Sequence, residues 1–126
     1  MSNEYRECEF SDLAGKRILK IDGLTEQYSD TVTFTTAEGI YKMFHEQDCC
    51  ESVTVEDVVG DIKDIMFEPI LSAEEVTEQG KVDEYDSYTW TFYKIDTAKG
   101  GITIRWYGSS NGYYSESVYL MKKEFL

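Results

Sequence analysis

Apolar and polar residues alternate with a period of two along much of the chain, a pattern typical of strands that bury one face. The two clearest stretches are "TVTFTT" (31–36) and "YDSYTWTFYKID" (85–96). In the second, the two alternating faces are Tyr88, Trp90 and Phe92 against Thr89, Thr91 and Tyr93. Both stretches are rich in β-branched and aromatic residues, which favour strands.

Seven segments fit strands, and short turn sequences join several of them. The segments are 16–22, 31–36, 40–46, 70–76, 85–96, 102–108 and 113–123. "AEG" predicts a hairpin between the second and third segments. "TAKGG" and "SSNG" predict that the last three form an antiparallel meander, since Asn and Gly accept the positive φ of a tight turn.

One segment, 54–66, has helical spacing instead. Its apolar residues predict a single buried stripe: Val55, Val58, Val59, Ile62, Ile65 and Met66. Thr54 is a suitable N-cap, and Pro69 prevents continuation. Gly60 inside such a helix costs about 0.5–1 kcal/mol relative to alanine, so packing would have to hold the helix in place.

These elements predict an α+β fold. We expect a single domain over 1–126, built on a mainly antiparallel, twisted sheet of about seven strands that could close partly into a barrel. The helix at 54–66 would cover this sheet. Residues 1–10 are expected to form a flexible N-terminal tail, and the acidic segment 77–86 a mobile loop.

The net charge bears more on the function than the overall composition does. The 126 residues carry a net charge of −13, and residues 46–86 alone hold 14 acidic and two basic side chains. A basic patch for nucleic-acid backbones or anionic membranes is therefore not expected. The acidic surface favours a host protein with a basic surface as partner, although a solubilising role explains the same charge.

Cellular location follows from what the sequence lacks. No apolar run approaches the roughly 20 residues that span a bilayer, and "MSNEYRECEF" lacks a signal-peptide pattern. Three cysteines, two of them adjacent, make a poor disulfide framework. A reducing cytoplasm is the expected compartment.

The segment "HEQDCCES" (45–52) concentrates the residues that carry chemistry. A metal site would use His45, Asp48, Cys49 and Cys50, but zinc needs about four ligands and adjacent cysteines usually point apart. A reactive thiol would be opposed by the neighbouring carboxylates. The structural interpretation is preferred: a tight strand-to-helix connection in which His45, Asp48 and Ser52 serve as hydrogen-bonding and capping groups. No metal and no cofactor are predicted.

Two surfaces are candidates for binding. On the predicted helix, Asp57, Asp61 and Asp64 form one acidic ridge, which could be solvated or could meet a basic partner or a divalent cation. In the C-terminal sheet, a guanidinium among aromatic rings could hold a planar, nucleotide-like ligand, although such rings usually pack in a core. That ligand-binding set is Arg105, Trp106, Tyr107, Asn111 and Tyr113, with Tyr114 beside it.

Three long motifs resemble a family of small uncharacterised proteins from bacteriophages and bacteria. They are "MFHEQDCCESVTVEDVVGDI", "SYTWTFYK" and "GITIRWYGSSNGYYSESV", and the resemblance covers most of residues 11–120. It implies a phage or prophage origin. It assigns no activity, so it gives no residue a catalytic role.

Three hypotheses follow. The first is a non-enzymatic, cytoplasmic phage accessory protein that binds, and inhibits, a host protein through its acidic face. The alternative is a small-ligand-binding or sequestering protein that uses the Arg105 aromatic surface. The third is a metal- or thiol-dependent site at His45, Cys49 and Cys50. Motifs for phosphate loops, nucleophile elbows and zinc proteases are missing from the sequence.

Overall fold

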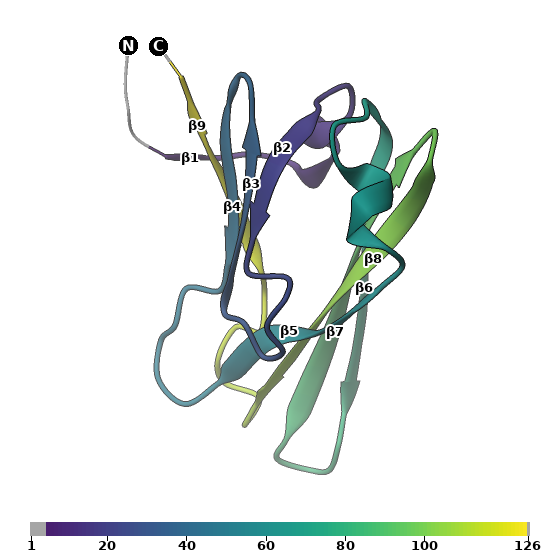
Figure 1. Cartoon of the computed structure of the whole chain (residues 1–126). Helices are drawn as coiled ribbons and strands as arrows, with labels where there is room; N and C mark the ends of the chain where they lie inside the picture. The colour runs from purple at the N-terminus through teal and green to yellow at the C-terminus, as the bar shows by residue number, and fades with distance from the viewer. Residues whose placement is uncertain (1–4, 126) are drawn as a thin grey trace.

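The computed structural model describes residues 5–125 and is built almost entirely from strands (Figure 1). Its nine strands are β1 (Arg6–Glu7), β2 (Ile18–Asp22), β3 (Thr31–Thr36), β4 (Gly39–Phe44), β5 (Ser52–Val59), β6 (Ile70–Lys81), β7 (Ser87–Thr97), β8 (Gly100–Ser110) and β9 (Tyr119–Glu124). Two 3₁₀ turns, η1 (Phe10–Leu13) and η2 (Ile62–Ile65), complete the described elements.

The strands form two separate antiparallel sheets that pack on each other as two layers (Figure 1). The five-stranded sheet has the order β1-β9-β4-β3-β2, and the four-stranded sheet has the order β5-β8-β7-β6. Each sheet has two edge strands. The predicted partial barrel is therefore wrong, because the two sheets do not close on each other.

The core lies between the two layers and draws on both. Its side chains with no or almost no exposure include Leu13, Ile18, Val32, Phe34, Met43, Val55, Ile65, Ile70, Tyr93, Ile95, Ile104 and Trp106. Both 3₁₀ turns contribute, through Phe10 and Leu13 from η1 and Ile65 from η2. Burial of large apolar side chains from both sheets is what holds the layers together.

Two of the three hairpins predicted from short turns are confirmed. β3 pairs with β4, from Thr31 opposite Phe44 to Thr35 opposite Ile40. β7 pairs with β8 over their whole length. The predicted meander is wrong at its third strand, because β9 leaves β8 and pairs with β4 and β1 in the other sheet.

The predicted helix at 54–66 is wrong, and a β-bulge explains the misleading pattern. The segment forms strand β5, which pairs with β8, followed by the turn η2. The register shifts between Val55 and Asp57, so an extra residue enters the strand. Val53 and Val55 are buried before the bulge, and Val58 packs against the core after it. Apolar residues that are two and then three positions apart resemble the spacing of a buried stripe on a helix.

Local conformation also opposes a helix here. Gly60 has a φ of +108°, which ends β5, and a Cβ at this position would lie 2.5 Å from the Gly101 carbonyl oxygen. Val59 is 57% exposed, so it is not part of a buried stripe. The α+β class is accordingly corrected to an all-β, two-sheet fold, with no α-helix in residues 5–125.

Two segments expected to lack structure are partly ordered into strands. Within the expected tail 1–10, Arg6 and Glu7 pair with β9 and Phe10 is buried, while residues 1–4 lie outside the described part. Within the expected loop 77–86, β6 continues through Lys81, and only residues 82–86 form the turn into β7.

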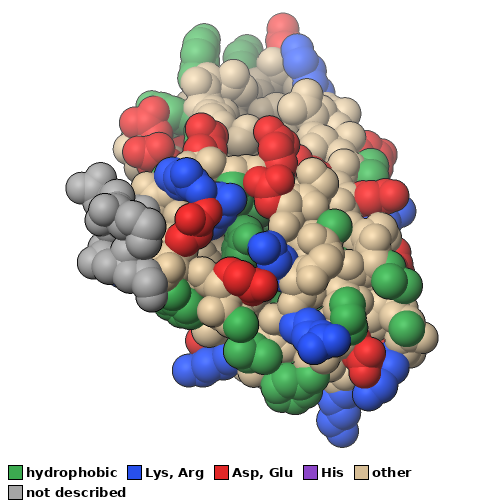
Figure 2. All heavy atoms as spheres, turned by 90° about the horizontal axis from the view of Figure 1, so that it is seen from above, with side chains coloured by type: hydrophobic (Ala, Val, Ile, Leu, Met, Phe, Trp, Pro, Cys, Tyr) green, Lys and Arg blue, Asp and Glu red, His purple; other side chains and the backbone are tan. Residues whose placement is uncertain are grey.

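Charge is mixed rather than segregated on the face in Figure 2, where acidic and basic side chains lie beside one another. The acidic residues of 46–86 lie in the β4–β5 connection, in the turns that follow β5 and β6, and on the strands β5 and β6 themselves. These are the two edge strands of the four-stranded sheet. Within residues 5–125, no helix has the length and apolar character needed to cross a membrane.

Candidate functional site

The "HEQDCCES" segment connects two strands, β4 and β5, rather than a strand and a helix. The His45 Nδ1–H donates to the carbonyl oxygen of Ser117 at 2.6 Å, and Nε2 lies 2.8 Å from Glu51 Oε2. Both ring nitrogens are therefore occupied by contacts to oxygen atoms of the protein. Neither nitrogen is left as a metal ligand or a base.

Glu51 is the centre of this connection, a structural role that no sequence pattern indicated. Its side chain is fully buried, and it accepts backbone N–H bonds from Asp48 at 3.0 Å and Cys49 at 2.9 Å. The Gln47 amide donates to it at 3.1 Å. The His45 hydrogen bond, aided by the backbone donors and opposed by burial, lowers the pKa of Glu51 to about 2. The arrangement orders a loop.

The two adjacent cysteines in this loop form a disulfide with each other, so the expectation that they point apart is wrong and neither is a free thiol in this structure. Asp48 contributes its backbone N–H to Glu51, whereas Ser52 is an exposed residue at the start of β5. Among residues 5–125, no three side chains of the His, Cys, Asp or Glu type gather as a metal site would require. Of the three predicted hydrogen-bonding and capping groups, His45 acts through its side chain and Asp48 only through its backbone N–H, and the segment leads into a strand, so there is no helix for them to cap.

The three aspartates of the predicted ridge do not share a face. Asp57 lies on β5 and binds Arg105 of β8. Asp61 accepts the Lys63 backbone N–H at 3.0 Å and so caps the short turn η2. Asp64 lies within η2, and its carbonyl oxygen accepts the Thr97 hydroxyl. The predicted acidic ridge is therefore wrong, because it required these residues to lie on one helix.

The predicted Arg105 ligand set is split between the two faces of β8. Trp106 points into the core and is only 1% exposed, while Arg105 and Tyr107 point outward. Asn111 and Tyr113 lie in the loop after β8, where Tyr113 is 90% exposed and donates its backbone N–H to Asn111. Only two of the five residues therefore share a surface.

On that outer surface, Arg105 and Tyr107 meet the outward side chains of β7. We call Tyr88, Trp90, Phe92, Arg105 and Tyr107 the aromatic platform. Trp90 lies opposite Tyr107 and Phe92 opposite Arg105 in the sheet register. The sequence showed the alternation in β7, but the inner face turned out to be the threonine side: Thr89, Thr91 and Tyr93 are buried.

The rings of the platform contact one another closely. Trp90 and Phe92 stack with centroids 5.9 Å apart, and Trp90 and Tyr107 are tilted at 4.8 Å. Tyr88 stacks on Tyr107 at 6.3 Å. The Arg105 guanidinium lies 5.2 Å from the Trp90 ring centroid, within the range of a cation–π contact. The five side chains are half-buried by these contacts, and parts of their faces remain open.

Arg105 is already neutralised by Asp57. Its Nε and Nη2 donate to the two carboxylate oxygens at 2.5 and 2.6 Å, a bidentate pair. The same hydrogen bonds lower the pKa of Asp57 and raise the pKa of Arg105. Both groups stay charged near neutral pH, but their charges cancel locally, which weakens the attraction of this guanidinium for a phosphate.

The platform lines an open hollow of about 640 Å³ with acidic sides. Glu56 from β5 and Glu78 from β6 flank it, and Val82 from the following turn completes the lining. Neither of these two carboxylates has a salt bridge in the described residues. The site therefore combines aromatic rings with a net negative charge.

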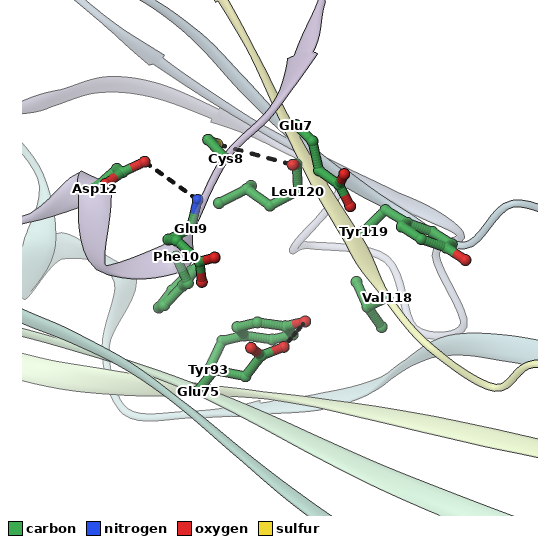
Figure 3. Close-up of a pocket in the computed structure, with 10 residues that line it drawn as sticks. All are labelled: Glu7, Cys8, Glu9, Phe10, Asp12, Glu75, Tyr93, Val118, Tyr119 and Leu120. Carbon is green, nitrogen blue, oxygen red and sulfur yellow. Dashed lines mark hydrogen bonds between the residues drawn. The ribbon is translucent and has the colours of Figure 1, made fainter.

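A second hollow of about 470 Å³ opens between the sheets, beside η1 and β9 (Figure 3). Phe10 packs on Tyr93 at its base, with ring centroids 4.7 Å apart, and the Tyr93 hydroxyl donates to Glu75 at 2.7 Å. Cys8 donates its S–H to the Leu120 carbonyl at 3.8 Å. This hollow contains the one free thiol of the described residues.

Cys8 and Tyr93 at this second hollow both have raised pKa values. Burial, assisted by the nearby Asp12, raises the pKa of the Cys8 thiol to about 11. Burial and the hydrogen bond to Glu75 raise the pKa of Tyr93. A thiol must be deprotonated to act as a nucleophile, so Cys8 is held in its unreactive form near neutral pH.

A comparison with known families places the chain in a family. The model of a domain of unknown function, DUF7448, matches residues 11–120. The chain belongs to the DUF7448 family. No curated protein and no solved structure matches it. The DUF7448 match spans the buried Glu51 connection and the whole aromatic platform, so both features lie inside the domain that defines the family.

Proposed function

We propose that this DUF7448 protein is a non-enzymatic binding protein whose aromatic platform receives basic side chains of a partner protein. The observation that carries the proposal is the outward position of the platform. Four aromatic rings occupy the outer face of the four-stranded sheet, and no other strand or helix of residues 5–125 lies over the hollow that they line.

The charge around the rings selects the class of ligand. Aromatic faces attract cations, tryptophan most strongly, and a lysine or arginine held on such a face gains about 0.5–2 kcal/mol. Glu56 and Glu78 add negative charge at the sides, while Asp57 cancels the charge of Arg105. A cationic ligand is therefore favoured over the nucleotide-like ligand that the sequence allowed for this surface.

The same proposal gives the acidic residues of segment 46–86 a role in binding. Residues 46–86 supply both edge strands, so their carboxylates border the platform on two sides. Long-range attraction from this border would steer a basic protein surface toward the rings. The resemblance to phage and bacterial proteins adds the proposal that this partner is a host protein in the cytoplasm, inhibited by being bound.

The platform is tested with a blocked peptide of alternating glycine and arginine, about eight residues long, titrated by calorimetry at low salt. Trp90→Ala should weaken binding about tenfold, which is about 1.4 kcal/mol, because the best cation-binding ring is lost. Added salt and Glu78→Gln should weaken it as well. Tyr113→Ala is the control, because this exposed ring lies outside the platform.

Two outcomes would contradict the proposal. One is a peptide affinity that does not change with Trp90→Ala and Glu78→Gln. The other is binding of adenosine monophosphate that depends on Arg105 and exceeds that of the peptide, since this would restore the nucleotide-like alternative. An NMR titration that follows the Trp90 indole signal shows directly whether the peptide reaches the rings.

A further inference from the structure

Strand β6 is a long sheet edge with little backbone pairing on its free side. It is the last strand in the order β5-β8-β7-β6, and it pairs with β7 from Ile70 to Lys81. At its start, Ile70 also exchanges backbone hydrogen bonds with Gly15 and Lys16, at 2.7 and 2.9 Å. Beyond Ile70, no further backbone hydrogen bond to the free side is found within residues 5–125.

The middle of β6 is also uncovered on both of its faces. Six consecutive residues, 74–79, are exposed, although alternate residues of a sandwich strand normally face the core. On the inner side, Glu75 receives only the Tyr93 hydroxyl. At Gly80, the Tyr88 ring lies so close that a Cβ would come within 2.4 Å of its hydroxyl oxygen. Free N–H and C=O groups along such an edge can pair with another strand.

Charge indicates which strand would pair there. Glu74, Glu75 and Glu78 make the edge acidic, against the single base Lys81. Antiparallel pairing of β6 with a second copy, centred on Val76, would place Glu74 opposite Glu78 of the copy. Like charges directly opposite destabilise a strand pair, so a second copy is disfavoured and a basic segment is favoured.

We propose that the β6 edge binds an extended basic segment of the partner as an additional strand of the four-stranded sheet. The proposal rests on the proposed function, because it describes how the same basic partner is held. On the outer face, Glu78 lies opposite Trp90, and Trp90 lies opposite Tyr107. An added strand beside β6 would therefore bring its outward basic side chains to Glu78, next to the platform.

The edge is tested with a blocked peptide of alternating lysine and threonine, about eight residues and roughly 26 Å when extended. In a second peptide the backbone amide of every lysine is N-methylated, and in a third the backbone amide of every threonine is N-methylated. In a paired strand, alternate amides face the neighbouring strand and the others face solvent. One N-methylated peptide should therefore bind about tenfold more weakly or worse, and the other within about threefold of the parent.

A matched pair of charge reversals locates the binding. Glu78→Lys should abolish most of the affinity, whereas Glu26→Lys makes the same change of net charge at an exposed loop position and should have little effect. Equal loss in both variants would mean that only the overall charge matters, and would overturn the proposal. Light scattering of the wild-type protein should show a monomer. A dimer that dissociates when Glu78 is substituted would instead show that a second copy of the chain binds the β6 edge, and would overturn the proposal.

Failure of this proposal can be told apart from failure of the platform. If both N-methylated peptides bind as well as the parent while Trp90→Ala still weakens binding, the edge proposal is wrong and the platform stands. If the N-methylated peptides differ but Trp90→Ala changes nothing, the edge binds without the platform. If the parent peptide does not bind at all, the edge proposal is overturned.

Discussion

Replacing Trp106 with alanine is expected to lower the free energy of unfolding by about 3–5 kcal/mol, whereas Trp90→Ala should cost less than half as much. Trp106 is 1% exposed and fills the space between the sheets, so its removal leaves a large cavity. Trp90 lies on the outer face, where water can fill the gap. Urea denaturation of both variants measures this difference, provided that the slope of the unfolding free energy against urea concentration is the same for both.

A third variant separates packing from hydrogen bonding at the same position. The Trp106 Nε1–H is buried and has no acceptor among the described residues. Trp106→Phe should therefore cost less than Trp106→Ala, because it keeps much of the ring and removes an unsatisfied donor. Equal losses for alanine at 90 and 106 would contradict the structure, since Trp90 would then have to be covered as deeply as Trp106.

The second large effect is expected at Glu51. Glu51→Gln should lower the melting temperature markedly at neutral pH, because it removes the negative charge that faces His45 in a fully buried site. Glu46→Gln is the matched control, since Glu46 is an exposed glutamate in the same connection. Thermal unfolding followed by circular dichroism compares the two variants.

The pH dependence of the same pair gives an independent check. In the folded protein the pKa of Glu51 is about 2, below its ordinary value of 4.5. A lowered folded pKa stabilises the protein above the ordinary value, and that stabilisation is lost as the pH falls toward 2. The melting temperatures of the wild type and Glu51→Gln should therefore converge between about pH 4.5 and 2. A gap that stays constant over this range would show that the carboxylate charge is not what stabilises the connection.

Local pairings could be predicted from the sequence, and the reasons are visible in the structure. The β3–β4 and β7–β8 hairpins join neighbouring segments through short turns, so alternation and turn chemistry were sufficient. The return of β9 to β4 is a long-range pairing that no local signal specifies. The β5 bulge changed the period of the apolar residues, and a period alone cannot distinguish a bulged strand from a helix.

The candidate site was recovered only in part for a related reason. Alternation showed that Tyr88, Trp90 and Phe92 share a face, but both faces of β7 carry large aromatic residues. Which face is buried depends on the opposite sheet, so the platform could not be separated from the core beforehand. The adjacent Arg105 and Trp106 were assigned to one surface, although consecutive strand residues point to opposite faces.

The position of β9 has a consequence for the order in which the chain acquires its structure. β9 lies between β1 and β4, so the five-stranded sheet stays divided until residues 119–124 have left the ribosome. The β3–β4 and β7–β8 hairpins can form earlier, whereas β1 has no other strand to join among the described elements. During synthesis, β4 would present an open edge to other nascent chains. Loss of the β9 segment would leave that edge open permanently.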